Sequence, residues 1–139
     1  MSEILSRVDP FEQLDFVYTP SRDVAADVEQ FATLLGATIA WAIEAFGARV
    51  ALVRLAAGPP EVLLTDHLEG ERPVLVYRVA DIEAAAGALR ERGFDPGPQL
   101  GIPHGPLYSF ELPGSGHRVA IYELTRPEAV TRFEGRRDF

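Results

Sequence analysis

Three histidines, His67, His104 and His117, are the side chains best suited to metal binding or proton transfer near neutral pH. They are spaced 37 and 13 residues apart, so they form no short ligand motif of the HxxxH kind. His104 lies in the stretch GIPHGP, and a loop of this composition either folds over the mouth of a cavity or simply caps a turn. We therefore take His104 as a candidate ligand-binding residue, and assign His67 and His117 to the surface.

Two charged residues, Arg54 and Glu111, stand among apolar residues and are 57 positions apart. If their apolar neighbours face a core, both charges face a cavity, where a charge must be paired or bind something. Alternatively, both lie on outer strands with their charged groups in water. Both remain candidate ligand-binding residues.

Other chemistries find no support in the sequence. It contains no Ser-His-Asp spacing, GxSxG elbow, phosphate-binding loop or GxGxxG motif. The absence of cysteine excludes disulfides, thiolate nucleophiles and cysteine-ligated metal sites. With 13 basic and 21 acidic residues, a net charge of −8 and no basic run, neither nucleic acid nor an anionic membrane is an expected partner. We expect one cytoplasmic domain over residues 1–139, without a signal or membrane-spanning segment.

The elements that position these residues follow from hydrophobic periodicity. Residues 14–19 form a predicted strand that Pro20 ends, and a helix with apolar residues three and four positions apart runs from Ser21 or Asp23 to Gly36. Three further strands are predicted at 38–45, 48–56 and 61–66.

The same order then recurs. A strand is predicted at 73–79, a helix at 81–92, a short strand within 94–106, and strands at 107–112 and 117–124. The chain is therefore a duplication of βαβββ units at about 14–66 and 73–124, followed by a tail at 125–139 with a short helix after Pro127 and a loose end. One helix covers only one face of each small sheet, so the other face must meet the second unit, another chain or a ligand.

Three segments, FVYTPSRDV, VYRVADIEAAAGALRERGF and LPGSGHRVAIYEL, combine with the duplication to carry a family resemblance over residues 14–124. The chain resembles the vicinal oxygen chelate superfamily, which includes glyoxalase I, bleomycin-resistance proteins and extradiol dioxygenases. The resemblance implies an α+β fold, in which two tandem βαβββ units form an incompletely closed, barrel-like curved sheet with a cavity away from the helices. It also implies a homodimer.

Enzymes of this superfamily hold a divalent metal with His and Glu side chains on the first and last strands of the units. The matching positions here are Phe16, Leu63, Val74 and Ala120. Hydrocarbon side chains cannot ligate a divalent cation. We therefore expect no metal and no cofactor.

Strand alternation assigns the remaining candidates to faces. The residues predicted to face the cavity are Phe16, Tyr18, Val74, Val76, Ala120 and Tyr122, whereas Val17, Leu75, Val119 and Ile121 are predicted to pack on the helices. The first group either fills a small barrel or lines a ligand site. Trp41 is either a core residue or a stacking platform.

The favoured hypothesis is a metal-independent small-molecule-binding protein of the glyoxalase/bleomycin-resistance type, which would sequester an aromatic or amphipathic compound. The candidate ligand-binding residues are Phe16, Tyr18, Trp41, Arg54, Val74, Val76, His104, Glu111, Ala120 and Tyr122. The alternatives are a divergent metal-dependent lyase or dioxygenase with a rearranged site, and a non-catalytic interaction module with a filled cavity.

Overall fold

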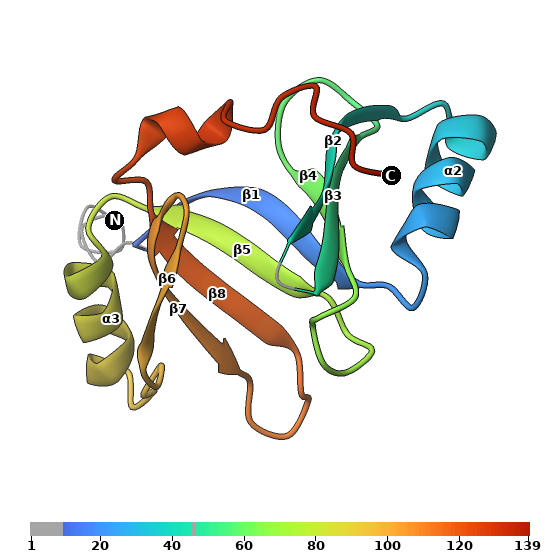
Figure 1. The fold of residues 1–139 in the computed structure, drawn as a ribbon. Helices are drawn as coiled ribbons and strands as arrows, with labels where there is room; N and C mark the ends of the chain where they lie inside the picture. The colour runs from blue at the N-terminus through green and yellow to red at the C-terminus, as the bar shows by residue number, and fades with distance from the viewer. Residues whose placement is uncertain (1–9, 46) are drawn as a thin grey trace.

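The computed structural model describes residues 10–45 and 47–139, which form an eight-stranded mixed sheet, two α-helices and a short 3-10 helix (Figure 1). The first unit consists of β1 (Phe11–Pro20), α2 (Val24–Leu35), β2 (Thr38–Ala45), β3 (Ala48–Arg54) and β4 (Glu61–Thr65). The second consists of β5 (Val74–Val79), α3 (Ile82–Glu91), β6 (Gln99–Ile102), β7 (Gly105–Glu111) and β8 (Arg118–Glu123), with the 3-10 helix η1 (Pro127–Val130) after it.

The sheet joins the two units through their first strands. Its strand order is β2-β3-β4-β1-β5-β8-β7-β6, so each unit runs outward as its first, fourth, third and second strand. Strand β1 pairs antiparallel with β5, while β1–β4 and β5–β8 are parallel pairs. The predicted duplication and the α+β curved sheet, which does not close into a barrel, are confirmed.

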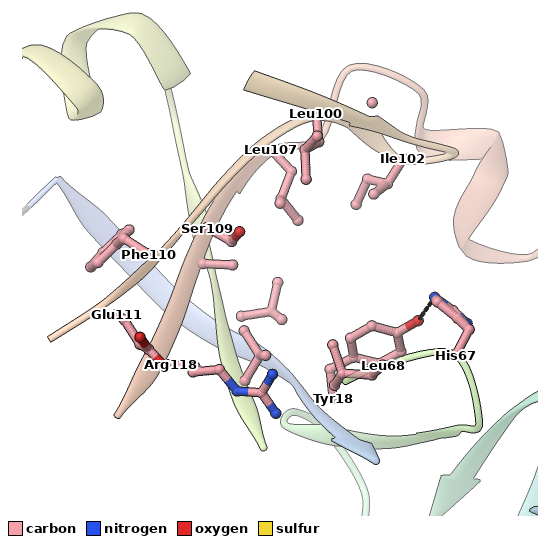
Figure 2. A pocket seen from close by; sticks show the side chains of 14 residues that line it. Tyr18, His67, Leu68, Leu100, Ile102, Leu107, Ser109, Phe110, Glu111 and Arg118 are labelled. Carbon is pink, nitrogen blue, oxygen red and sulfur yellow. Dashed lines mark hydrogen bonds between the residues drawn. The ribbon is translucent and has the colours of Figure 1, made fainter. Parts of the chain in front are cut away.

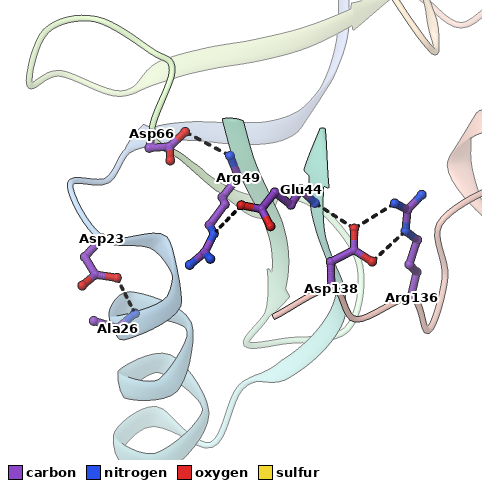
Figure 3. Close-up of polar contacts among 7 residues, drawn as sticks. All are labelled: Asp23, Ala26, Glu44, Arg49, Asp66, Arg136 and Asp138. Carbon is purple, nitrogen blue, oxygen red and sulfur yellow. Dashed lines mark hydrogen bonds and ion pairs between the residues drawn. The ribbon is translucent and has the colours of Figure 1, made fainter. Parts of the chain in front are cut away.

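Both helices begin at the aspartates that the sequence indicates. The Asp23 carboxylate accepts a hydrogen bond from the Ala26 N–H (3.0 Å), and the Asp81 carboxylate accepts from the Glu83 and Ala84 N–H groups (Figure 3 shows the first of these caps). Helix α2 ends at Gly36, whose φ of 71° lies in the left-handed region that favours glycine. These caps fix where each helix lies against its sheet.

Each helix covers the same side of its own unit. Helix α2 packs Val24 and Val28 on Ala51, Val53 and their neighbours. Helix α3 packs a second cluster, whose buried members are Val79, Ile82, Ala85, Ala86, Leu89, Tyr108 and Ile121. A third cluster lies on the opposite face of the second unit and contains Val74, Val76, Ala120 and Tyr122. The predicted division of residues between the two faces is therefore confirmed for the second unit.

The C-terminal segment is not the loose end that the sequence predicts. It runs along β2, where the Gly135 N–H donates to the Ala40 carbonyl (2.8 Å) and the Asp138 N–H donates to the Ala42 carbonyl (2.7 Å). The Asp138 carboxylate also accepts from the Glu44 N–H and pairs with Arg136 (Figure 3). The prediction is wrong because β2 is an outer strand, and its free backbone groups bind this segment.

None of the helices within residues 10–45 and 47–139 is long and apolar enough to cross a membrane.

Candidate ligand-binding site

A cavity of about 610 Å³ opens on the sheet face of the second unit that points away from α3 (Figure 2). Strands β5 to β8 supply most of its wall, and β1 and the segment after β4 supply the rest. The lining residues are Tyr18, His67, Leu68, Val74, Val76, Leu100, Gly101, Ile102, Leu107, Ser109, Phe110, Glu111, Arg118 and Ala120. The volume lies within the range of roughly 300–1,000 Å³ that small-molecule sites occupy.

Most of the cavity wall is hydrocarbon. Val74, Val76 and Ala120 form its floor and are 7 %, 5 % and 1 % exposed. Leu100 and Ile102 on β6 and Leu107 on β7 form the wall above them (Figure 2). An apolar molecule entering here would lose most of its contact with water, which favours binding by roughly 25 cal/mol per Å² of apolar surface removed from water.

Polar groups of β7 and β8 gather at one side of the cavity. Arg118 donates hydrogen bonds to the carbonyls of Glu69 (2.6 Å) and Arg72, while its buried Nε has no partner among the described residues. Glu111 lies opposite Arg118 in the β7–β8 register, but the described part of the chain contains no ion pair between them. The Arg118 guanidinium is thus used to hold the segment that links the two units.

A chain of three polar residues lies at the opposite side. The Tyr18 hydroxyl and His67 Nε2 are 2.8 Å apart, and His67 Nδ1 lies 2.6 Å from the Thr65 hydroxyl (Figure 2 draws the first contact). Burial raises the pKa of the Tyr18 phenol, against a smaller lowering by the nearby Thr65 hydroxyl and with a smaller rise from the Asp66 charge. Tyr18 is therefore a neutral phenol at physiological pH.

Known structures share this arrangement. The chain superimposes on methylmalonyl-CoA epimerase from Mycobacterium tuberculosis with a TM-score of 0.68 and 17 % identity, covering 90 % of this chain and 99 % of that one. For a glyoxalase/bleomycin resistance protein/dioxygenase superfamily member from Vibrio splendidus 12B01, the values are 0.62, 14 %, 78 % and 96 %. The chain has the vicinal oxygen chelate fold.

A third similar structure contains a ligand. A variant of the Streptomyces coelicolor methylmalonyl-CoA epimerase, in complex with 2-nitronate-propionyl-CoA, matches with a TM-score of 0.64 and 16 % identity over 84 % of this chain and 99 % of that one. No protein-family model matches the sequence, and no curated protein matches it significantly. The similarity is thus one of fold.

The residues at the metal positions of the vicinal oxygen chelate fold do not suit a divalent cation. Phe16, Val74 and Ala120 belong to one apolar cluster, and Leu63 faces Tyr18 across the β1–β4 register. None carries a lone pair that could bind a metal. Within residues 10–45 and 47–139, no three His, Asp or Glu side chains form a group that could hold one.

Five of the ten residues predicted to bind a ligand line this cavity: Tyr18, Val74, Val76, Glu111 and Ala120. Three others, Phe16, His104 and Tyr122, pack against one another with ring centroids 5.6–6.0 Å apart. Phe16 and Tyr122 belong to the same cluster as the cavity floor, so these rings support it from the side. Their participation in ligand binding stays a prediction.

The other two predicted residues lie in the first unit. Trp41 packs against Phe133 (ring centroids 5.6 Å apart), and Arg54 pairs with Glu61 and, at 2.7 Å, with Glu134. The structure therefore does not bring Arg54 and Glu111 to one cavity. Phe133 and Glu134 come from the C-terminal segment, which sequence periodicity left unassigned.

Sequence analysis missed several residues of the site. His67 and Leu68 come from a polar stretch between the units, and Leu100, Gly101 and Ile102 come from a Gly- and Pro-rich stretch without clear alternation. The only signal available for β6 was the room for one short strand.

Asp15 was also missed. The β1–β5 register shifts between Leu14 and Phe16, which brings the Asp15 carboxylate to the Tyr122 hydroxyl and Gln13. Burial is the largest cause that raises the pKa of Tyr122, followed by its hydrogen bond to Asp15.

Proposed function

We propose that the chain binds an amphipathic or aromatic small molecule in the cavity of the second unit, without a metal ion. The observation that supports this proposal is the cavity itself, which has about 610 Å³ of space, an apolar floor and polar groups at two opposite sides. A molecule with an apolar body and polar ends matches this distribution.

Metal independence belongs to the proposal because the four positions that would ligate a cation carry hydrocarbon side chains. Binding then rests on burial of apolar surface and on hydrogen bonds at the rim. Such a protein acts by sequestering its ligand rather than by polarising it.

The test is a calorimetric titration of the purified protein with a panel of drug-like aromatic compounds. Trp41 fluorescence is a poor readout, because Trp41 lies in the first unit against Phe133 and does not line the cavity. The variant Ser109→Trp fills the cavity from an exposed position, so it should weaken binding at least about tenfold, or about 1.4 kcal/mol.

The matched control is Leu34→Trp, which adds the same ring at a position that is 75 % exposed on α2. It should leave the affinity unchanged. If no compound binds the wild-type protein, or if Ser109→Trp binds as tightly as wild type, the proposal fails.

The structural similarity to methylmalonyl-CoA epimerases supports one alternative, an enzyme acting on an acyl-CoA ester. Metal analysis of protein purified without chelator, together with deuterium uptake by methylmalonyl-CoA in heavy water, separates the two functions. Stoichiometric metal or enzyme-dependent deuterium uptake favours the enzyme.

We also propose that the chain is a cytoplasmic homodimer, as the fold resemblance implies. Sedimentation at micromolar concentration tests the assembly, and a species at the monomer mass of 15.2 kDa would overturn it. Fractionation of the source cells tests the location.

A further inference from the structure

The chain of Thr65, His67 and Tyr18 leaves one hydrogen-bond donor unused at the cavity wall. Thr65 is 0 % exposed, and its hydroxyl oxygen already accepts a hydrogen bond from the His67 backbone N–H (3.3 Å). A buried hydroxyl proton needs an acceptor. Among the described residues, the acceptor in hydrogen-bond geometry is His67 Nδ1, at 2.6 Å.

This contact assigns the tautomer of His67. A neutral imidazole carries one proton, and Nδ1 cannot hold it while it accepts from Thr65. The proton is therefore on Nε2, which donates to the Tyr18 hydroxyl oxygen at 2.8 Å. The opposite tautomer would leave the Thr65 proton buried without a partner.

The Tyr18 hydroxyl consequently keeps its own proton for another group. Its oxygen accepts from His67, and no acceptor within residues 10–45 and 47–139 takes the phenol proton. Tyr18 lines the cavity beside His67 and Leu68 (Figure 2). A donor hydrogen bond into the phenol oxygen also polarises the O–H bond and strengthens it as a donor.

The surroundings select the kind of acceptor. Asp66 lies near Tyr18, and its negative charge disfavours an anion at the phenol. Asp66 is held in place by the Arg49 N–H, which donates to its Oδ1 at 3.0 Å (Figure 3). An uncharged acceptor joined to an apolar body fits both the phenol and the hydrocarbon floor.

We infer that the ligand carries a neutral carbonyl group that accepts the Tyr18 hydroxyl proton, with His67 and Thr65 as positioning residues. This inference rests on the proposed function and names the chemical class of its ligand. The carbonyl lies at the β1 side of the cavity, and the apolar body lies over Val74, Val76 and Ala120.

Two probes of nearly equal size test the inference: 2-acetylnaphthalene, which has a carbonyl, and 2-ethylnaphthalene, which has a methylene in its place. The wild-type protein should bind the ketone about three- to tenfold more tightly than the hydrocarbon. The carbonyl stretching band of the bound ketone should lie at lower frequency in wild type than in Tyr18→Phe. In Tyr18→Phe the two probes should bind equally.

The positioning residues give a graded result. Thr65→Val removes the hydroxyl that sets the tautomer, so the carbonyl band should move part of the way toward its position in Tyr18→Phe, and Thr65→Ser should restore it. His67→Leu, at an exposed position, gives the same test should Thr65→Val fail to fold.

The outcomes separate the two claims. If neither probe binds the wild-type protein, the proposed function fails. If both bind equally tightly, with the carbonyl band unchanged between wild type and Tyr18→Phe, the ligand class is wrong while the binding function stands.

Discussion

The two βαβββ units share one topology but treat the sheet face away from their helices in opposite ways. In the first unit, the C-terminal segment covers this face, with Phe133 against Trp41 and Glu134 paired with Arg54. In the second unit, the matching face holds an open cavity of about 610 Å³. The duplication thus produced two potential clefts, and the chain fills one of them with its own residues.

The charges of the two faces are reversed. Arg54 and Glu61 pair across β3 and β4, whereas the positions 57 residues later, Glu111 and Arg118, carry the opposite charges across β7 and β8. The first pair is completed by Glu134 of the C-terminal segment. In the second, Arg118 binds backbone carbonyls instead, which leaves the Glu111 carboxylate accessible at the cavity. The difference teaches that the second unit is the one kept available for a ligand.

The largest expected effect concerns the hairpin of β6 and β7, which walls the cavity. A Cβ added at Gly105 would collide with the Glu123 carbonyl oxygen and lie 2.8 Å from Thr125 Oγ1, at a φ of 153°. The matching position of the first unit, 57 residues earlier, is Ala48 and carries a Cβ. Gly105→Ala should therefore lower the free energy of unfolding by about 3 kcal/mol or more, as measured by urea denaturation.

Its control is Gly101→Ala in the same hairpin, where an added Cβ meets nothing within 4 Å. This variant should unfold at nearly the wild-type urea concentration. A Gly105→Ala protein as stable as Gly101→Ala would show that the two units tolerate the same residue at this position.

A smaller effect is expected where the first unit is covered. Phe133→Ala removes the ring that packs on Trp41, so it should cost about 1–2 kcal/mol of stability and shift the Trp41 emission to longer wavelength. Ligand affinity in the second unit should not change. Val130→Ala, at a position 44 % exposed, is the control, and unchanged Trp41 emission in Phe133→Ala would contradict the contact.

The smallest effect is a pH dependence that only the second unit carries. Burial lowers the pKa of His104 below its ordinary value of 6.5, against a smaller opposing effect of Asp15 and with smaller lowering by Arg132 and Arg126. The unfolded chain therefore binds a proton more readily than the folded chain. Stability from this group is fully present above pH 6.5 and is lost as the pH falls from there through the folded pKa.

Thermal unfolding between pH 7.5 and 5 should show this loss in wild type and less of it in His104→Gln. The matching position of the first unit is Gly47, which does not titrate. His117→Gln, at an exposed position, should keep the wild-type pH dependence. Parallel profiles for wild type and His104→Gln would remove this difference between the units.

The sequence was sufficient for features that depend on neighbouring residues. The caps Asp23 and Asp81, the glycine that ends α2 and the alternation of Val74 and Val76 are local patterns, and the structure confirms each. The duplication followed from the same patterns repeated about 57 residues apart.

The sequence was insufficient for features that depend on partners far along the chain. The segment 131–139 has no periodicity, and its hydrogen bonds join residues as far as 94 positions apart. The irregularity in β1 that brings Asp15 to Tyr122 depends on pairing with β5, which no pattern within β1 reveals. The open cavity was likewise unpredictable, because side-chain volume alone does not say whether a face is filled.

The backbone contacts between the C-terminal segment and β2 have a consequence for aggregation. A sheet grows into polymers by adding strands at an unpaired border, and residues 135–138 occupy that border on the β2 side. The border on the other side is β6, which is only four residues long and offers a short template for strand addition. The chain thus resists fibril growth at its longer border with residues that belong to neither repeat.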